Sequence, residues 1–336
     1  MSEQKLFVLE DEDTTPDYQA LSLDEKIERS KQILRLASKM SWEYYGKPMI
    51  VCYSGGKDSD VLLRLCEDTL PLSDFEVLNS HTTVDAPETV YHIRNVINRI
   101  NANGGHASIR YPVDADGNFI SMWKLIPKKQ MPPTRIVRCC CQVLKEASTP
   151  NRMAVLGVRS SEGSNRQGRD VFGVRGGSYR EGKFFSLDHT EEVFRESQEI
   201  KDSAWDCTLI KRMKEHGDTL VNAIYDWLDV DIWDYIRREN IPTNPLYEKG
   251  YKRIGCIGCP LETYRMKIKD FETYPKIKQA YMRAFEKMIE HRKEIGLDCQ
   301  WETAQEVFEW WIEQKRYEFE GQMTLDDFLN GDNDGD

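Results

Sequence analysis

The stretch YSGGKDSD, Tyr53–Asp60, constrains the fold more than any other part of the chain. It directly follows the apolar run Met49–Cys52, and this order is typical of a strand that turns sharply into a helix. Gly55 and Gly56 can adopt positive φ and leave backbone N–H groups unobstructed, so the turn can cradle an anion at a helix N-terminus. The spacing is not the G-x-x-x-x-G-K-[ST] of the common nucleotide triphosphatases. The residues predicted to hold phosphate are Ser54, Gly55, Gly56, Lys57, Asp58 and Ser59, whereas the plain alternative is an ordinary Gly-Gly turn.

Strand and helix patterns alternate after residue 22. Apolar residues at helical spacing predict a helix over 23–45, and further helices are expected after the Gly-Gly turn and from Pro87 to Gly104. Strands are predicted at 49–52, 75–83, 106–113 and 153–159. The alternation implies an α/β fold, with a mostly parallel twisted sheet, flanking helices and a C-terminal helical extension. Since ligands bind beyond the carboxyl ends of such strands, loops 54–59, 85–89 and 157–166 are expected to converge on one rim.

Changes of pattern along the chain predict four regions. These are an acidic flexible arm (1–22), a nucleotide-binding domain that carries the cysteines (23–265), a C-terminal helical extension (266–320) and an acidic tail (321–336). Within the domain, residues 160–219 are rich in Gly, Arg and Ser, and long irregular segments of this kind are usually functional or disordered. Their arginines form either a phosphate-binding strip or a set of solvated loop charges: Arg166, Arg169, Arg175 and Arg180.

The charge balance narrows the classes of function. A net charge of −11 argues against a free-standing, non-specific nucleic-acid binder, which needs a basic face. No apolar run approaches the roughly 20 residues of a membrane span, and residues 1–13 are acidic, unlike a signal peptide. The sequence therefore predicts a cytoplasmic protein without membrane contact. In such a chain the 9 cysteines indicate reduced thiols, some of them metal ligands.

Several motifs together resemble one family. SGGKDS resembles the PP-loop of the ATP pyrophosphatase superfamily, whose fold is adenine nucleotide alpha-hydrolase-like. VDAPET (84–89) resembles D-T-G-x-x-F-P-E-T of the phosphoadenosine phosphosulfate (PAPS) reductase family in shortened form. GVRSSEGSNR (157–166) resembles that family's G-x-R-x-x-E-S-x-x-R, with Gly163 in place of Ser. The run from Tyr225 to Cys259 resembles its W-x-x-x-D-V-W-x-Y-I…N-P-L-Y-x-x-G-Y…C-x-x-C segment. The resemblance covers about residues 49–265 and implies further nucleotide contacts from Asp85, Glu88, Gly157 and Arg159.

Two groups of cysteines are expected to form a metal site. RCCCQVLKEA carries Cys139, Cys140 and Cys141, and GCIGCP carries Cys256 and Cys259 on a glycine-containing turn. In the family that the sequence resembles, adenylyl sulfate reductases and Dnd-type DNA phosphorothioation proteins carry a 4Fe–4S cluster on such cysteines. Alignment with their pattern selects as ligands Cys140, Cys141, Cys256 and Cys259. Zinc and unligated thiols are the alternatives, and a shift by one residue would exchange Cys141 for Cys139.

The family contains more than one reaction. Its reductases attack sulfur with a cysteine in a C-terminal E-C-G-[LI]-H motif, whereas no cysteine follows Cys299 here. The resemblance is therefore nearest in type to Dnd-type sulfurtransferases and implies a PP-loop ATP pyrophosphatase or sulfurtransferase in nucleic-acid modification. Lys57, Arg159 and Arg166 would act on the phosphates, and Asp58 would hold Mg²⁺. The alternatives are a phosphoadenylyl or adenylyl sulfate reductase and a non-catalytic nucleotide-binding regulatory protein.

The expected partners follow from the same resemblance. They are ATP or PAPS, proteins of a modification complex, and DNA or RNA reached through those proteins. The peptide QMTLDDFL (322–329) either binds a partner or caps the last helix.

Overall fold

The computed structural model describes residues 17–114, 116–145, 149, 151–163, 166, 169–174, 183–199, 208–215 and 217–313. Most of the predicted acidic arm, the acidic tail with its QMTLDDFL peptide, Arg175 and Arg180 lie outside these residues. The chain divides into two compact units. The first comprises Met1–His81, Pro87–Arg110 and Ala147–Ile254, and the second comprises Thr82–Ala86, Tyr111–Glu146 and Gly255–Asp336. The four regions expected from the sequence stay a prediction.

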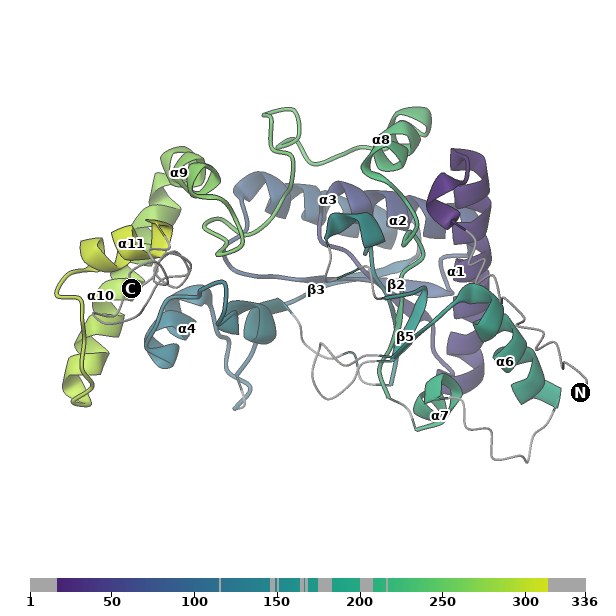
Figure 1. Ribbon diagram of the computed structural model, residues 1–336, viewed down its shortest axis with the longest axis horizontal. Coiled ribbons are helices and arrows are strands. Elements are labelled where there is room, and N and C mark those ends of the chain that lie inside the picture. The colour runs from purple at the N-terminus through teal and green to yellow at the C-terminus, as the bar shows by residue number, and fades with distance from the viewer. Residues whose placement is uncertain are drawn as a thin grey trace, which may run out of the picture. The chain divides into compact units, whose positions relative to one another are not determined.

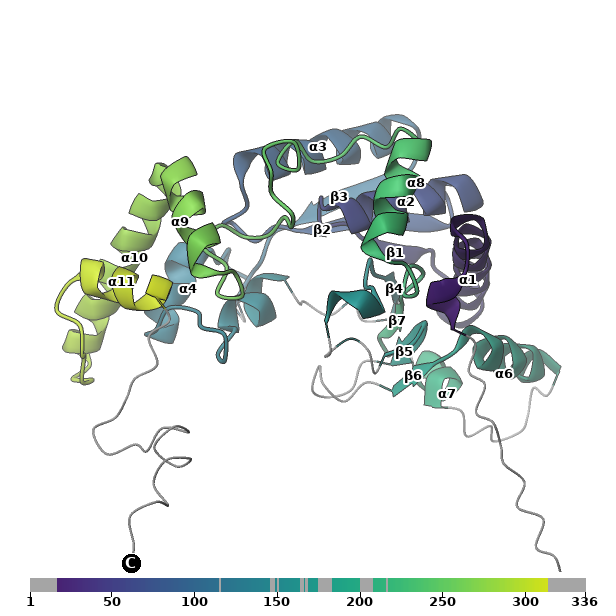
Figure 2. The same cartoon turned by 45° about the horizontal axis from the view of Figure 1, so that its top comes forward.

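The first unit is built on a 7-stranded sheet in the order β3-β2-β1-β4-β7-β5-β6. Figure 1 gives the arrangement of the ribbon, and Figure 2 labels each strand of the sheet. The strands are β1 (Met49–Cys52), β2 (Phe75–Ser80), β3 (His106–Arg110), β4 (Met153–Val155), β5 (Phe172–Val174), β6 (Lys183–Phe185) and β7 (Thr219–Val221). From β3 to β7 all neighbours are parallel, whereas β5 runs antiparallel to both β7 and β6. This confirms the predicted α/β fold with a mostly parallel sheet.

Several strands are shorter than predicted, and others were not expected. The strand predicted at 106–113 ends at Arg110, because Pro112 has no N–H to offer a neighbouring strand. The strand predicted at 153–159 ends at Val155. Strands β5 and β6 lie inside the segment 160–219, which was predicted to be irregular. Strands of three residues are too short to show an alternating pattern.

Helices flank this sheet. They are α1 (Leu23–Tyr45), α2 (Lys57–Thr69), α3 (Pro87–Ala102), α6 (Leu187–Glu199), α7 (Thr208–Lys214) and α8 (Asp229–Arg238), with short turns η1 (Tyr18–Ala20) and η3 (Ser160–Glu162). Helix α1 begins at a capping box, in which the Ser22 hydroxyl accepts from the Glu25 N–H and the Glu25 carboxylate accepts from the Ser22 N–H. Both views of the ribbon show α2 and α3 along one side of the sheet, with α6 and α7 near β5 and β6 (Figure 2).

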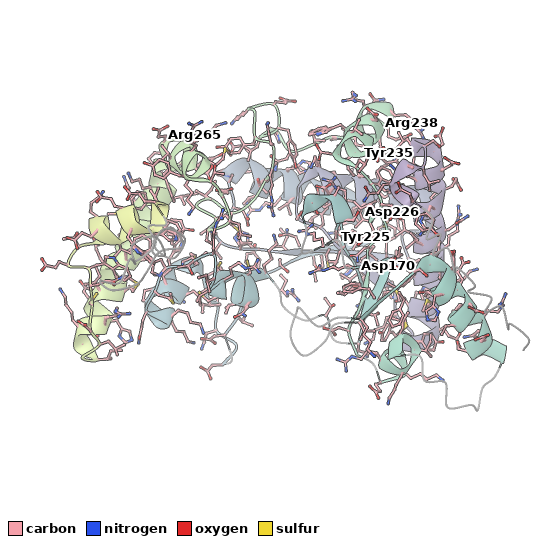
Figure 3. The ribbon with its side chains drawn as sticks, in the orientation of Figure 1. Asp170, Tyr225, Asp226, Tyr235, Arg238 and Arg265 are labelled. Carbon is pink, nitrogen blue, oxygen red and sulfur yellow. The ribbon has the colours of Figure 1, made fainter. Side chains whose placement is uncertain are left out.

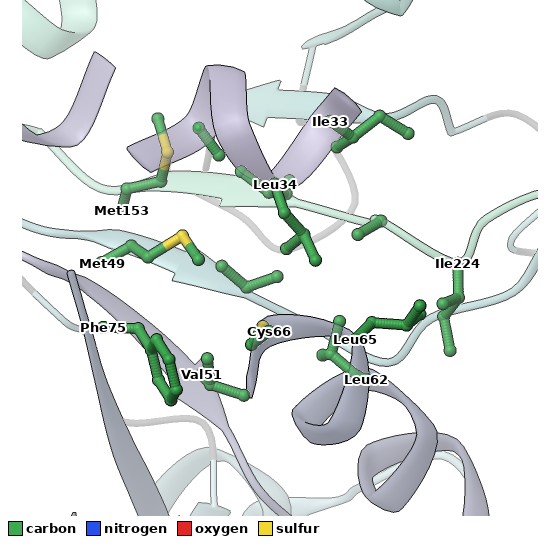
Figure 4. Close-up of a cluster of buried hydrophobic side chains, with 14 of the residues drawn as sticks. Ile33, Leu34, Met49, Val51, Leu62, Leu65, Cys66, Phe75, Met153 and Ile224 are labelled. Atoms are coloured by element: carbon green, nitrogen blue, oxygen red, sulfur yellow. The ribbon is translucent and has the colours of Figure 1, made fainter. Parts of the chain in front are cut away.

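The core of the first unit joins α1, α2 and the central strands (Figure 4). Its side chains have at most 1% of their surface exposed: Ile33, Leu34, Met49, Val51, Leu62, Leu65, Cys66, Phe75 and Met153. Each such side chain stabilises the fold by about 1.5–3 kcal/mol relative to an exposed position. Because the core includes residues of both β1 and α2, it holds firmly the two elements that the loop 53–56 connects.

The second unit consists of α4 (Met122–Lys129), the π-helical turn η2 (Cys141–Lys145), α9 (Tyr264–Thr273), α10 (Pro275–Glu294) and α11 (Ala304–Glu313). Its core is a cluster of aromatic rings: Phe271, Tyr281, Phe285, Phe308 and Trp311. The Trp311 indole N–H donates to the Pro133 carbonyl at 2.8 Å, which satisfies the one polar atom of that ring. In neither unit does a described helix have the length and apolar character that a membrane span requires.

Candidate functional site

The strand order places one pair of loops side by side. Strand β1 lies between β2 and β4. From β1 the chain adds β2 and then β3 on one side, whereas β4 and then β7 are added on the opposite side of β1. In open parallel sheets such a reversal leaves a crevice beyond the carboxyl ends of the two central strands, and ligands bind there. The loop after β1 carries residues 53–56, and the loop after β4 carries Gly157 and Arg159.

The conformation of the first loop depends on glycine. Gly55 has φ of 74°, and a Cβ atom there would lie 2.8 Å from the Ile93 side chain. Gly56 precedes the first residue of α2, and its N–H donates to the Ser59 hydroxyl at 3.2 Å. A Cβ at Gly157 in the second loop would lie 3.2 Å from the backbone carbonyl of Asp58, which is tighter than an ordinary contact. The second loop therefore passes close to the backbone of the first turn of α2.

Two cations and two carboxylates meet between the first turn of α2, the loop after β4 and the start of α8. Lys57 Nζ lies 2.9 Å from Asp229 Oδ1 and 3.3 Å from Asp58 Oδ2. Arg159 Nε lies 2.6 Å from Asp58 Oδ1, and its terminal nitrogen lies 3.1 Å from Asp229 Oδ1. We call these four residues the charge network. Lys57 and Arg159 are only 6% and 4% exposed, so their charges require partners.

Electrostatics in the charge network favour the ionised carboxylate of Asp229. Burial alone would raise the pKa of Asp229, but the hydrogen bond and charge of Lys57 and the charge of Arg159 outweigh burial and lower it. The side chain of Asp229 is 63% exposed, whereas both cations are buried behind it. A polyphosphate that enters from solvent would therefore compete with Asp229 for two preorganised cations.

Two of the loop amides bond within the protein. The Lys57 N–H donates to the Tyr247 hydroxyl at 2.8 Å, and the Gly56 N–H is taken by Ser59. A phosphate oxygen that accepts from the Gly56 N–H would have to replace the Ser59 hydroxyl, and one that accepts from the Lys57 N–H would have to replace the Tyr247 hydroxyl. Ser54 is exposed, and its hydroxyl donates to the Ser59 hydroxyl at 3.2 Å.

The other predicted site residues lie outside the charge network. Arg166 pairs with Glu162, and its backbone carbonyl accepts from the Tyr225 hydroxyl at 3.0 Å. Tyr225 lies with Asp170 and Asp226 in one part of the first unit (Figure 3). Glu88 pairs with Lys249 at 2.6 Å.

Asp85, a predicted nucleotide contact, belongs to the second unit. Its backbone pairs there with that of Cys256, and its carboxylate accepts from the Thr82 N–H at 3.2 Å.

The motif comparison gave no role to three residues that surround the loop. Asp229 completes the charge network, and Tyr247 binds the Lys57 amide. The Asn244 amide donates to the Gly55 carbonyl at 3.2 Å and to the Thr89 hydroxyl at 3.0 Å. Asn244 and Tyr247 lie in the matched N-P-L-Y stretch, and this match is the sequence feature that could have identified them as site residues. Asp231, the motif carboxylate two residues after Asp229, is instead bound to Lys26 at 2.6 Å.

The predicted metal ligands lie in the second unit. Cys256 and Cys259 stand on a turn that closes through a Cys259 N–H to Cys256 carbonyl bond of 3.1 Å. Burial raises the pKa of the Cys256 thiol to about 12, with the charge of Asp85 adding to the effect. A hydrogen bond with Cys141 raises the pKa of Cys140, and burial and Cys256 raise it further. The charge of Cys256 is one of the smaller causes that raise the pKa of Cys140, and both cysteines also raise the pKa of Tyr281 in the same unit.

These thiols fit an iron–sulfur cluster in chemical type, since such clusters are held by cysteine sulfur. Their arrangement does not match a metal site. Among the described residues, which include both cysteine pairs and Cys139, no group of three or more His, Cys, Asp or Glu side chains is placed to hold a metal ion. The four-cysteine site therefore stays a prediction.

Comparison with known proteins gives matches that extend over most of the chain. The sequence matches the phosphoadenosine phosphosulfate reductase domain over residues 48–262. An uncharacterized protein of Methanocaldococcus jannaschii is 26% identical over 250 residues, which are 71% of this chain and 42% of that protein. The chain thus spans less than half the length of this relative. The adenosine 5'-phosphosulfate reductase of Anoxybacillus flavithermus is 23% identical over 233 residues, which are 67% of this chain and 79% of that enzyme.

Among solved structures, the U34-tRNA thiolase of Methanococcus maripaludis with its 4Fe–4S cluster aligns with a TM-score of 0.38 at 12% identity. The alignment covers 83% of both chains. A likeness of this size does not identify a function.

Proposed function

The chain belongs to the phosphoadenosine phosphosulfate reductase family, and we propose that it binds ATP at the charge network and cleaves it between the α- and β-phosphates. The observation that carries this proposal is the placement of Lys57 and Arg159 beside a glycine loop at the reversal of strand order. Lys57 and Arg159 are buried cations that both bind the exposed carboxylate of Asp229. They are suited to exchange this carboxylate for the oxygens of a phosphate group.

The proposed reaction transfers an adenylyl group. A hydroxyl, carbonyl or phosphate oxygen of the acceptor attacks the α-phosphate, the bond from the α-phosphorus to the oxygen that bridges to the β-phosphate breaks, and pyrophosphate leaves. A sulfur nucleophile then displaces AMP from the acceptor, so that carbon or phosphorus exchanges oxygen for sulfur. Lys57 and Arg159 would offset the charge that builds up on the departing pyrophosphate. Asp58 and Asp229 would bind the Mg²⁺ that accompanies ATP.

The choice of ATP over an adenylyl sulfate rests on the motif comparison, as does an acceptor in DNA or RNA. A reductase is the second candidate, because a relative of 23% identity bears the name adenosine 5'-phosphosulfate reductase. A regulatory protein that binds the nucleotide without turnover is the third.

Labelled nucleotides distinguish the three candidates. Anaerobically purified protein is incubated with ATP, Mg²⁺ and candidate acceptors, and AMP and pyrophosphate are quantified. In parallel it is incubated with PAPS or adenylyl sulfate and thioredoxin, and sulfite is measured. We expect AMP and pyrophosphate, reduced at least about 100-fold in Lys57→Ala, as is typical of losing one transition-state charge contact. Sulfite without pyrophosphate would contradict the proposal in favour of reduction, and binding without either product would favour the regulator.

We also infer that the thiols of Cys140, Cys141, Cys256 and Cys259 hold a 4Fe–4S cluster. The support is their chemical type and the presence of both cysteine pairs, as free thiols, in the second unit. When bound, such a cluster supplies a Lewis-acidic or redox-active iron. Iron and acid-labile sulfide are measured in the anaerobic protein, in Cys256→Ser and in Cys66→Ser, which alters a core thiol. Iron content that is absent, or unchanged in Cys256→Ser, would refute the inference.

A further inference from the structure

Three buried polar side chains meet at the base of the loop that precedes α2. The Tyr53 hydroxyl donates to Asp60 Oδ1 at 2.5 Å, and His92 Nε2 lies 3.0 Å from the same oxygen and 2.9 Å from the Tyr53 hydroxyl. The exposed fractions are 2% for Tyr53, 5% for Asp60 and 9% for His92. The second carboxylate oxygen of Asp60 is buried and has no hydrogen-bond partner among the described residues. None of the motifs discussed above assigns a role to these three residues.

The three residues tie together every element that borders the loop. Tyr53 is the last residue before Ser54, and Asp60 lies in the first turn of α2, so their bond joins the two ends of the loop. The Asp60 N–H also donates to the Gly56 carbonyl at 3.0 Å. His92 comes from α3, next to Ile93, whose side chain limits the space at Gly55. The Tyr53 carbonyl accepts from the Asn79 amide of β2 at 2.8 Å.

The energetics of this cluster argue against a role in stability alone. A buried carboxylate with an unpaired oxygen costs more than a well-packed apolar group in the same space. Burial raises the pKa of Asp60, and the bonds from His92 and Tyr53 only partly oppose this effect. The charge of Asp58 also raises the pKa of Asp60. For Tyr53, Arg99 lowers the pKa and Tyr247 raises it. Directional hydrogen bonds at this position specify geometry in a way that apolar contacts do not.

We propose that Tyr53, Asp60 and His92 are positioning residues that hold the ends of the glycine loop at the separation that phosphate binding requires. The proposal rests on the nucleotide-binding function proposed above. Without the bonds at Asp60 Oδ1, the loop keeps its sequence and its charges but its amides and Lys57 sample more than one arrangement. Binding then includes the cost of ordering the loop, so the affinity for nucleotide falls.

Tyr45, a buried tyrosine at the end of the sheet where the parallel strands begin, provides the matched control. The Tyr45 hydroxyl donates to the Gly217 carbonyl at 2.7 Å, just before the first residue of β7, and Tyr45 is 6% exposed. Tyr45→Phe and Tyr53→Phe each remove one buried hydroxyl from the same unit. Only Tyr53 borders the loop, whereas Tyr45 lies at the amino ends of the parallel strands.

The test measures the Kd for ATP and for inorganic pyrophosphate by calorimetry, with the melting temperature of each variant, on the full chain. We expect Tyr53→Phe to raise both Kd values about 10-fold, which corresponds to about 1.4 kcal/mol, and Tyr45→Phe to change them less than about 2-fold at a similar loss of melting temperature. Asp60→Asn keeps an acceptor oxygen for Tyr53 and is expected to bind within about 3-fold of wild type, while Asp60→Ala matches or exceeds the loss in Tyr53→Phe. Wild-type affinity in both Tyr53→Phe and Asp60→Ala would refute the positioning role but not the proposed nucleotide site. A wild-type protein that binds neither ligand would refute the nucleotide site and the positioning role with it.

Discussion

Replacement of Gly157 by alanine tests whether the close approach of the loop after β4 to the first turn of α2 creates the nucleotide site. The added Cβ would lie 3.2 Å from both the carbonyl carbon and the carbonyl oxygen of Asp58, and 3.4 Å from the Ser59 nitrogen. All three are backbone atoms, which cannot rotate away as a side chain would. Ordinary contact begins near 3.4 Å, so the loop after β4 must move away from α2 by a few tenths of an ångström.

The cost of this movement divides between stability and binding. Overpacking of this kind costs about 1–3 kcal/mol, and each kcal/mol lowers the melting temperature by about 2–4 °C in a domain of 150–250 residues. Arg159 follows Gly157 closely and would move with the loop, which lengthens its bonds to Asp58 and Asp229. If about 1.4 kcal/mol of the cost falls on the phosphate contacts, the Kd for ATP rises about 10-fold.

Gly105→Ala is the matched control for this substitution. Its Cβ would lie 3.2 Å from the Ile100 carbonyl oxygen and 2.8 Å from the Ile100 side chain, at the start of β3 and therefore at the amino edge of the sheet. Calorimetric titration with ATP and thermal unfolding are measured for both variants. We expect both to lose stability and only Gly157→Ala to lose affinity. Wild-type affinity in Gly157→Ala, despite a lowered melting temperature, would refute the reasoning.

Three further substitutions test the packing of each unit. Lys26→Met leaves the carboxylate of Asp231 buried without its cation, and we expect urea unfolding to show a loss of about 3–5 kcal/mol, so a loss under about 1 kcal/mol would contradict this. Burial raises the pKa of Asp170, so the folded state gains protons more readily and its stability falls as pH rises from about 4 through the raised pKa. Asp170→Asn should therefore be more stable than wild type at pH 7 but not at pH 4. The same difference in the free energy of unfolding at both pH values would contradict a raised pKa of Asp170. Gly258→Ala forces a left-handed φ of 72° on alanine and places its Cβ 2.6 Å from the Phe271 ring, so we expect a loss of about 2 kcal/mol or more in chemical unfolding, which a wild-type midpoint would exclude.

The parallel sheet and the glycine loop were predictable because their signals are local. An apolar run before Gly55 and Gly56, followed by a helical pattern, specifies strand, turn and helix within a dozen residues. The charge network was predictable only in part. Lys57, Asp58 and Arg159 stand in recognisable motifs, but the position of Asp229 beside them arises from the packing of α8 near α2.

The same limit applies to the second unit. No local pattern indicates that residues 111–146 pack with the helices after residue 255. Helices α4 and α10 are in contact with each other. The sequence of each indicates only an amphipathic helix with an apolar face, and not which segment covers that face. Contacts between distant segments follow from shape complementarity, which residue spacing does not encode.

The chain passes repeatedly between the two units, and this has a consequence for biosynthesis. Residues 111–146 leave the first unit after β3 and return for β4, so the segment that carries Cys140 is complete on the ribosome more than a hundred residues before Cys256. Until α10 and α11 have been synthesised, the second unit lacks its aromatic core, while the strands β1 to β4 can already pair. The nascent chain therefore carries three consecutive cysteines, Cys139–Cys141, before the second cysteine pair and the helices of their unit have been made. Protection from oxidation at that stage must come from the reducing surroundings or from another protein rather than from the fold itself.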